Sequence, residues 1–139
     1  YFSFLLLIPF SASVFANVSI DVYCFTTGGE KPINMEMRVY HDTGANWTAG
    51  FVKYQNSKKP IPIFLKSSVV EVLSEDAPYQ TTDSWLEIVD GKITGIYEII
   101  MQGTQIPSFT YESYQNKRKF AFIFASSIDR TTESGCLWE

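Results

Sequence analysis

The stretch "SWLEIVDGKITGIYEIIMQ", residues 84–102, decides the fold. Its two apolar runs are separated by Asp90-Gly91, a dipeptide that favours the two-residue turn of a β-hairpin because both positions tolerate a positive φ. If Val89 faces Lys92 across the turn, Trp85 lies opposite Ile96, and such an aromatic–aliphatic pair stabilises a sheet by roughly 0.2–1 kcal/mol. The stretch therefore predicts two long antiparallel strands.

The same two-residue period recurs on both sides of this hairpin. In residues 17–24, one face carries Val18, Ile20, Val22 and Cys24, and residues 33–41 alternate in the same way. Residues 74–83 are polar and predict a loop with at most one helical turn. The other predicted strands cover residues 46–56, 61–73 (bent or split near Ser67-Ser68), 106–114 and 119–127.

About eight short strands with tight connections predict a single all-β domain, in which an antiparallel barrel is preferred over a sandwich. The 11 Phe, 8 Tyr and 3 Trp agree with this, because aromatic residues favour strands. Large side chains of inward parity are expected to fill an eight-strand interior: Met35, Met37, Phe120, Phe122 and Phe124. Three tyrosines, expected to form an outer binding face or to lean over the barrel wall, fall on the exposed parity: Tyr23, Tyr40 and Tyr54.

Residues 1–16 are expected to be a signal peptide. The apolar run Phe2–Phe10 is followed by small residues, and Val14-Phe15-Ala16 suits signal peptidase. The alternative is a buried first strand or helix. A membrane span needs about 20 apolar residues, which this run does not reach. We therefore expect an exported domain, residues 17–139, in the periplasm or secreted, without a membrane span in the mature chain.

The chain has two cysteines, Cys24 and Cys136, which lie 112 positions apart. In an oxidising compartment two lone cysteines most simply form one disulfide. Such a bond would hold the two ends of the domain together, so the first and last strands are expected to be neighbours. Free thiols or a metal-binding pair are the alternatives.

A basic group is expected on this acidic chain, whose net charge is −4. The overall charge disfavours a nucleic-acid partner, since phosphate binding needs a basic face. Residues 54–67 and 114–127 resemble each other, and both contain a basic turn. If the two turns share one end of the barrel, they form a basic rim for an anionic partner, made of Lys58, Lys59, Lys117, Arg118 and Lys119. Otherwise they are solvated turn tips.

Catalytic motifs are lacking in this sequence. His41 is the only histidine, no serine lies in a nucleophile motif, and neither a phosphate-binding loop nor a CxxC pair occurs. We therefore expect a packing role for His41, no cofactor, no metal and no enzymatic activity. Trp47, in "GANWTAG", is a candidate binding anchor if its indole is exposed.

In outline, the signal peptide, the small all-β domain and the terminal cysteines resemble those of the small periplasmic lysozyme inhibitors. The resemblance covers the architecture only and transfers no inhibitory residue to this chain. The sequence thus favours an exported, non-catalytic binding protein with a protein partner, such as an inhibitor or immunity protein. A small-ligand carrier that uses the barrel interior, and an enzyme, are the alternatives.

Overall fold

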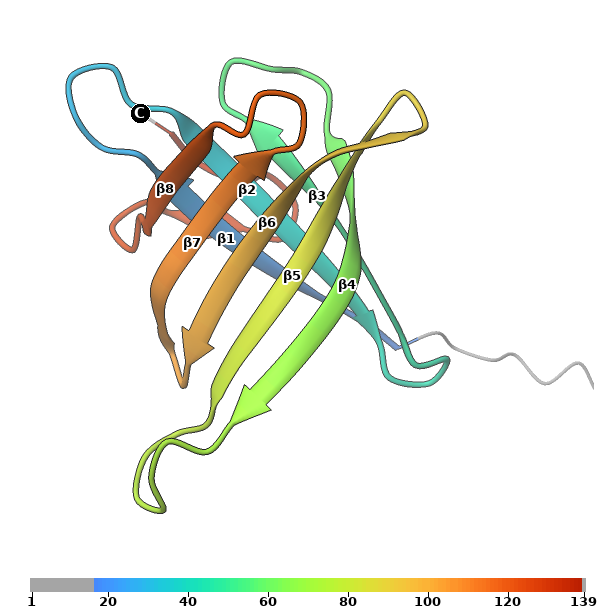
Figure 1. The fold of residues 1–139 in the computed structure, drawn as a ribbon, viewed down its shortest axis with the longest axis vertical. Helices are drawn as coiled ribbons and strands as arrows, with labels where there is room; N and C mark the ends of the chain where they lie inside the picture. Colours follow the sequence, from blue (N-terminus) through green and yellow to red (C-terminus); the bar gives the residue numbers. More distant parts are fainter. Residues whose placement is uncertain (1–16, 139) are drawn as a thin grey trace, which may run out of the picture.

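The computed structural model describes residues 17–138, which form a closed antiparallel barrel of eight strands (Figure 1). The predicted all-β fold, with a barrel rather than a sandwich, is confirmed, whereas the predicted signal peptide lies outside the described residues. Within residues 17–138, no helix is long and apolar enough to cross a membrane. The strands are β1 (Val18–Thr26), β2 (Asn34–Asp42), β3 (Trp47–Tyr54), β4 (Ile61–Glu71), β5 (Gln80–Val89), β6 (Lys92–Gln102), β7 (Gln105–Ser113) and β8 (Lys119–Phe124).

Each strand pairs with the next along the chain, and β8 pairs with β1 to close the barrel. The connections therefore alternate between the two ends (Figure 1). We call one end the turn end; it carries the connections 27–33, 55–60, 90–91 and 114–118. The opposite end, which carries the connections 43–46, 72–79 and 103–104, is called the mouth end.

Two of the eight strand pairings are short. β1 and β8 pair through Phe25–Phe124 and Thr26–Ile123 alone, and β3 and β4 pair only from Gly50–Ile63 to Val52–Ile61. Both short pairings lie toward the turn end. The barrel is therefore a three-stranded sheet, β1–β3, and a five-stranded sheet, β4–β8, which diverge toward the mouth end (Figure 1).

The β5–β6 hairpin forms around Asp90-Gly91, with Val89 opposite Lys92 as predicted. The predicted Trp85–Ile96 pair is wrong, because a register shift after Glu87 places Trp85 opposite Tyr97. The shift leaves Thr94 without a partner on β5, and its hydroxyl donates to the Glu87 carboxylate at 2.7 Å. A buried polar contact thus accounts for the irregularity.

The β4–β5 hairpin differs from the prediction in the length of its loop. β4 is irregular between Leu65 and Ser67, close to the predicted bend. The predicted loop over residues 74–83 is too long, because β5 already begins at Gln80. Thr81 and Thr82 are β-branched and pair with β4, so Asp83 belongs to a strand rather than to a loop.

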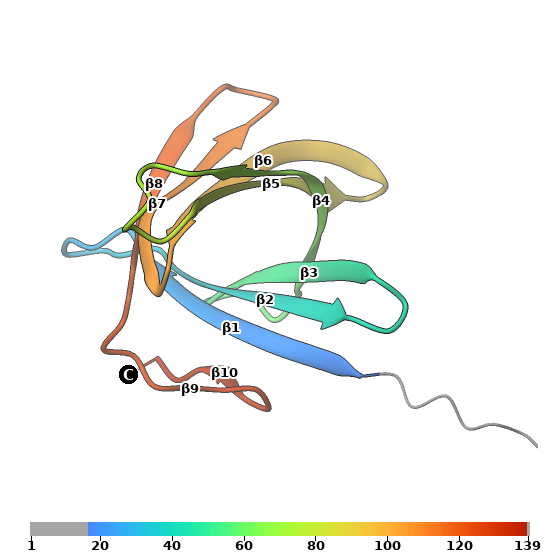
Figure 2. The same ribbon diagram turned by 90° about the horizontal axis from the view of Figure 1, so that it is seen from below.

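The apolar face of β1 points outward, not into the barrel. Val22 and Cys24 are buried against a second cluster outside the barrel, whereas Phe25 belongs to the main core. The cover is a C-terminal hairpin of β9 (Arg130–Thr131) and β10 (Gly135–Cys136), which lies beside β1 outside the barrel (Figure 2). The expected outward parity of Tyr23 and Tyr54 is therefore wrong, since both pack against the main core.

The barrel interior is filled over most of its length by large apolar side chains. Phe25 and Phe109 stack with their ring centroids 4.0 Å apart, and Phe109 contacts Phe122 edge to face. Of the five side chains expected inside, Met35, Met37 and Phe122 are buried, and Phe120 and Phe124 pack against them. Burial of this apolar surface is the main stabilising term of the fold.

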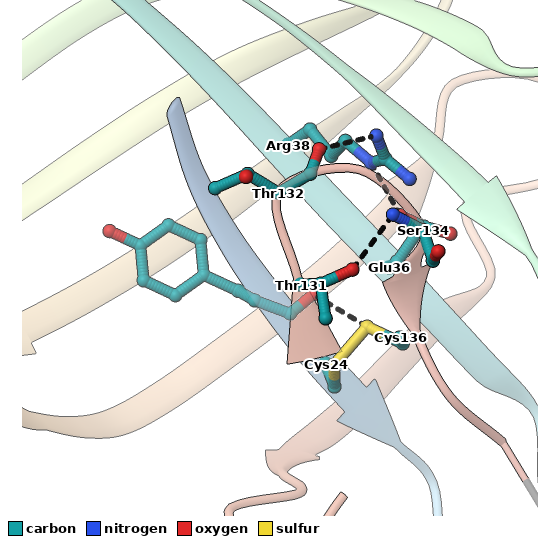
Figure 3. A network of polar contacts seen from close by, with 8 residues as sticks. Cys24, Glu36, Arg38, Thr131, Thr132, Ser134 and Cys136 are labelled. Atoms are coloured by element: carbon teal, nitrogen blue, oxygen red, sulfur yellow. Dashed lines mark hydrogen bonds and ion pairs between the residues drawn. A yellow bond between two sulfur atoms is a disulfide. The ribbon is translucent and has the colours of Figure 1, made fainter. Parts of the chain in front are cut away.

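The predicted disulfide is confirmed: Cys24 and Cys136 are bonded, with their Cα atoms 5.8 Å apart. It joins β1 to the C-terminal hairpin rather than to β8. An ion pair supports the hairpin, because Arg38 contacts Glu36 at 2.7 Å and donates to the carbonyl oxygen of Thr132 (Figure 3). A Cβ at Gly135 would overlap this pair, so glycine is needed there for space as well as for its positive φ.

Replacing Cys24 and Cys136 with Ser should lower the free energy of unfolding by roughly 2–5 kcal/mol, because the bond restricts the unfolded chain over a long loop. Urea denaturation of the oxidised wild type and the double variant measures the difference. Two titratable thiols in the native wild-type protein would contradict the bond itself.

Candidate functional site

The turn end of the barrel is closed by a buried carboxylate, Glu87 of β5. Its side chain accepts hydrogen bonds from the hydroxyls of Thr94 at 2.7 Å, Tyr97 at 2.7 Å and Tyr111 at 2.8 Å. Because Tyr97 donates to Glu87, the 2.8 Å contact between the Tyr54 and Tyr97 hydroxyls requires Tyr54 to donate. Three hydroxyls thus replace water around one carboxylate, and the Tyr54 hydroxyl supports one of them.

The tyrosines of this group are held in their neutral form. Burial is the largest cause of the raised pKa of Tyr97, and the neighbouring Tyr54 and Glu87 add to it. The pKa of Tyr111 is likewise raised, by burial first and then by its contact with Glu87. Gly95 leaves room for the Tyr111 ring, which a Cβ at that position would overlap. We call Glu87 and the hydroxyl-bearing side chains around it the plug, because they fill the turn end of the barrel.

Tyr97→Phe should lower the free energy of unfolding by about 1–3 kcal/mol, because Glu87 loses a donor and the Tyr54 hydroxyl loses its acceptor. Tyr79→Phe is the matched control, since Tyr79 is 62 % exposed. Urea denaturation of both variants measures the effect. Equal stabilities for the two variants would show that the Glu87 group contributes nothing.

Stability should fall as the pH rises above about 10, the ordinary pKa of tyrosine. There the unfolded chain releases the Tyr97 proton while the folded chain keeps it, so folding loses about 1.4 kcal/mol per pH unit for this group. Below that pH both states are protonated and the contribution is constant. Urea denaturation at a series of alkaline pH values should give a shallower fall for Tyr97→Phe; parallel curves would contradict the assignment.

The mouth end, by contrast, contains a cavity of about 220 Å³. It lies between the two diverging sheets and is walled by side chains from β1 to β6. Most of the wall is apolar, with contributions from Met37, Val39, Leu65, Ile99 and Met101. The polar and aromatic part of the lining consists of Tyr23, His41, Thr48, Ser68, Asp83 and Trp85.

Two residues that line this cavity each carry a buried polar atom without a hydrogen-bond partner. Among residues 17–138 these are Asp83 Oδ1, an acceptor, and Trp85 Nε1, a donor. Trp85 is only 2 % exposed, so its indole N–H is cut off from bulk solvent. Leaving such groups unpaired costs roughly 1–3 kcal/mol each, and because native proteins contain few of them, each one calls for a specific explanation.

His41, for which a packing role was expected, lies near the end of β2 in the lining of the cavity and makes polar contacts there. Its Nε2 is 3.3 Å from Asp21 Oδ2, and its Nδ1 is 3.1 Å from Thr48 Oγ1. The imidazole therefore bridges β1 and β3 across the end of β2. A carboxylate–imidazole–hydroxyl line is also the order in which a base activates a nucleophile, but the Asp21 and His41 side chains are 50 % and 40 % exposed, so bulk water screens their interaction.

Charge is divided between the two ends of the barrel. The mouth-end segments 17–21, 41–48, 67–83 and 100–107 contain no Lys or Arg, and they carry the carboxylates of Asp21, Asp42, Glu71, Glu75, Asp76 and Asp83. The turns of the opposite end carry five of the 11 Lys and Arg residues, and Lys92 and Lys119 adjoin two of these turns. The field at the mouth end is therefore negative, and Asp21 and Asp83 both act to raise the pKa of Tyr23, after burial as the largest cause.

The predicted binding residues fall on both ends. The turns that hold Lys58, Lys59, Lys117, Arg118 and Lys119 do share the turn end (Figure 1). Three of these side chains have local partners: Lys117 lies over Tyr114, Arg118 over Phe120, and Lys119 pairs with Glu112 at 3.6 Å. Trp47 begins β3 at the mouth end, where it is 44 % exposed.

Asp83 was missed at the sequence level, because residues 74–83 were read as a loop. Extending the two-residue period of β5 back from Trp85 places Asp83 on the same inward face as Glu87. Comparisons with protein-family models, with curated proteins and with solved structures return no significant match. The candidate site therefore rests on its own geometry.

Proposed function

We propose that this chain is an exported, non-catalytic binding protein that takes up a small ligand in the mouth-end cavity. The observation that carries the proposal is the pair of unpartnered buried atoms, Asp83 Oδ1 and Trp85 Nε1, in the lining of one cavity. Ligand sites typically combine a largely apolar wall with a few polar groups that set orientation. The disulfide agrees with an oxidising compartment such as the periplasm or the extracellular space.

The two ends differ in a way that suits this role. In the plug around Glu87, the hydroxyls of Thr94, Tyr97 and Tyr111 all donate to the carboxylate. At the mouth end, the buried polar atoms of Asp83 and Trp85 have no partner. At about 220 Å³ the cavity lies below the roughly 300–1,000 Å³ of sites for drug-sized ligands. The proposal therefore concerns a metabolite-sized molecule.

Titration with a panel of small amines, alcohols and carboxylates tests this proposal. At least one class should shift the indole N–H resonance of Trp85 and raise the melting temperature, because a ligand that binds only the folded state stabilises it. Ser68→Phe should abolish the shift by filling the cavity. If no class moves the Trp85 resonance in the folded wild type, the cavity is not a binding site.

A protein partner bound at the turn end is the second candidate, and it is favoured by the basic turns that gather there. An inhibitor or immunity protein acting on an envelope enzyme would use such loops on a rigid scaffold. Lys58 and Lys59 project from the β3–β4 turn as exposed residues. Electrostatic complementarity of this kind acts mainly on the association rate.

Reversing Lys58, Lys59, Lys117 and Lys119 to Glu should abolish capture of the anionic partner from an envelope extract and remove the salt dependence of its association. Stability should change little, because exposed charges contribute about 0–1 kcal/mol each. Lys66→Glu on β4, away from both turns, is the matched control. Unchanged capture at low salt would exclude the turn end as the partner site.

A further inference from the structure

We propose that the ligand of the mouth-end cavity is a small organic cation, an ammonium compound with an adjacent hydrogen-bond acceptor and an apolar body. This inference rests on the proposed function of the cavity and specifies its ligand. It is carried by three features of the lining: an unpartnered carboxylate oxygen, an unpartnered indole N–H and aromatic rings set in an acidic end of the barrel.

Asp83 supplies the charge for this recognition. Its Oδ1 is buried and has no donor among the described residues, and an ammonium N–H makes a stronger bond to a carboxylate than a neutral donor does. Two other carboxylates near the rim have partners: Asp21 contacts His41, and Asp42 Oδ1 accepts the backbone N–H groups of Gly44 and Ala45. Among the residues that line the cavity, Asp83 is the one carboxylate, so it is the anionic acceptor available to a ligand.

Trp85 lies two residues farther along the same strand and faces the same cavity. Its Nε1 is a donor only, so it requires an acceptor such as a hydroxyl or ether oxygen on the ligand. The Asp83 carboxylate needs a hydrogen-bond donor, the Trp85 indole needs an acceptor, and the two residues are neighbours on one face of β5. A ligand that pairs with both therefore carries its ammonium group and its acceptor close together. An amino-alcohol arrangement satisfies both groups at once.

The rest of the lining favours an organic ion over a metal ion. Tyr23 and Trp85 are aromatic residues of the lining, and an aromatic ring attracts a cation over its face by roughly 0.5–2 kcal/mol. Met37, Leu65, Ile99 and Met101 surround an apolar group. A hard metal ion such as Ca²⁺ needs six to eight oxygen ligands, and residues 17–138 bring no three His, Cys, Asp or Glu side chains together as a metal-binding group.

The field around the site points the same way. Six carboxylates and no Lys or Arg lie in the mouth-end segments. Arg130 of the C-terminal hairpin is a cation close enough to act on Tyr23, yet the pKa of Tyr23 is raised, by burial and then by Asp21 and Asp83. The negative charges therefore outweigh Arg130 at this hydroxyl. An incoming cation is attracted at long range, and an anion is repelled.

Three probes of similar shape test the charge: phenylethanolamine, a cation; styrene glycol, its neutral counterpart; and mandelate, an anion. Calorimetry and the Trp85 indole resonance report binding to the oxidised protein. Phenylethanolamine should bind at least tenfold more tightly than styrene glycol, and mandelate should bind most weakly. Raising the salt concentration should weaken only the amine, a measurement that needs no variant.

Asp83→Asn should reduce phenylethanolamine affinity at least tenfold, to the level of styrene glycol, whose own affinity should stay unchanged. Glu98→Gln is the matched control, because Glu98 is exposed on the neighbouring strand and outside the cavity lining. Styrene glycol or mandelate binding as tightly as the amine would overturn the cation inference and leave the cavity as a ligand site. Failure of all three probes would also overturn it, and the wider panel then decides whether the cavity binds anything.

Discussion

One buried carboxylate constrains how the turn end of the barrel is built. Glu87 sits inside an otherwise apolar barrel, where an ionised group without partners would cost several kcal/mol. Three hydroxyls bond it directly, and the Tyr54 hydroxyl backs up Tyr97. The register shift leaves Thr94 free to donate to Glu87, and the absence of a side chain at Gly95 makes room for the Tyr111 ring. At the turn end the polar atoms of this network bond one another. The unpaired buried polar atoms belong to residues at the mouth end.

Short pairings and charge separation act together at that mouth end. The β1–β3 and β4–β8 sheets diverge because the pairings that join them, β1 with β8 and β3 with β4, hold only two and three residue pairs and lie toward the turn end. The divergence makes room for a cavity, and the carboxylates of the surrounding segments give it a negative field. A barrel with a hydrogen-bonded plug at one end, an acidic mouth end and basic turns presents two chemically distinct surfaces on one rigid scaffold.

The strands, the hairpin turn and the disulfide were predictable because each follows from local chemistry: alternation, Asp90-Gly91 and a pair of lone cysteines. What alternation does not give is which face is inward. On β1 the more apolar face is outward, since the distant C-terminal hairpin covers Val22 and Cys24, and the inward face carries Tyr23. The cavity depends on such long-range packing and on a strand start at Gln80, so the sequence pattern indicated the barrel but not Asp83 as part of its lining.

The position of Cys136 after β8 constrains the order in which the molecule is completed. Neighbouring strands pair locally and can form as hairpins, which is a fast kind of folding step. Joining β1 to β8 and bonding Cys24 to Cys136, in contrast, requires the whole described chain. Until then Cys24 and the outward apolar side of β1 stay uncovered. The C-terminal hairpin therefore distinguishes a complete chain from a truncated one. A chain that ends before Cys136 retains all eight barrel strands, but its Cys24 is a free thiol and the outward apolar face of β1 is exposed.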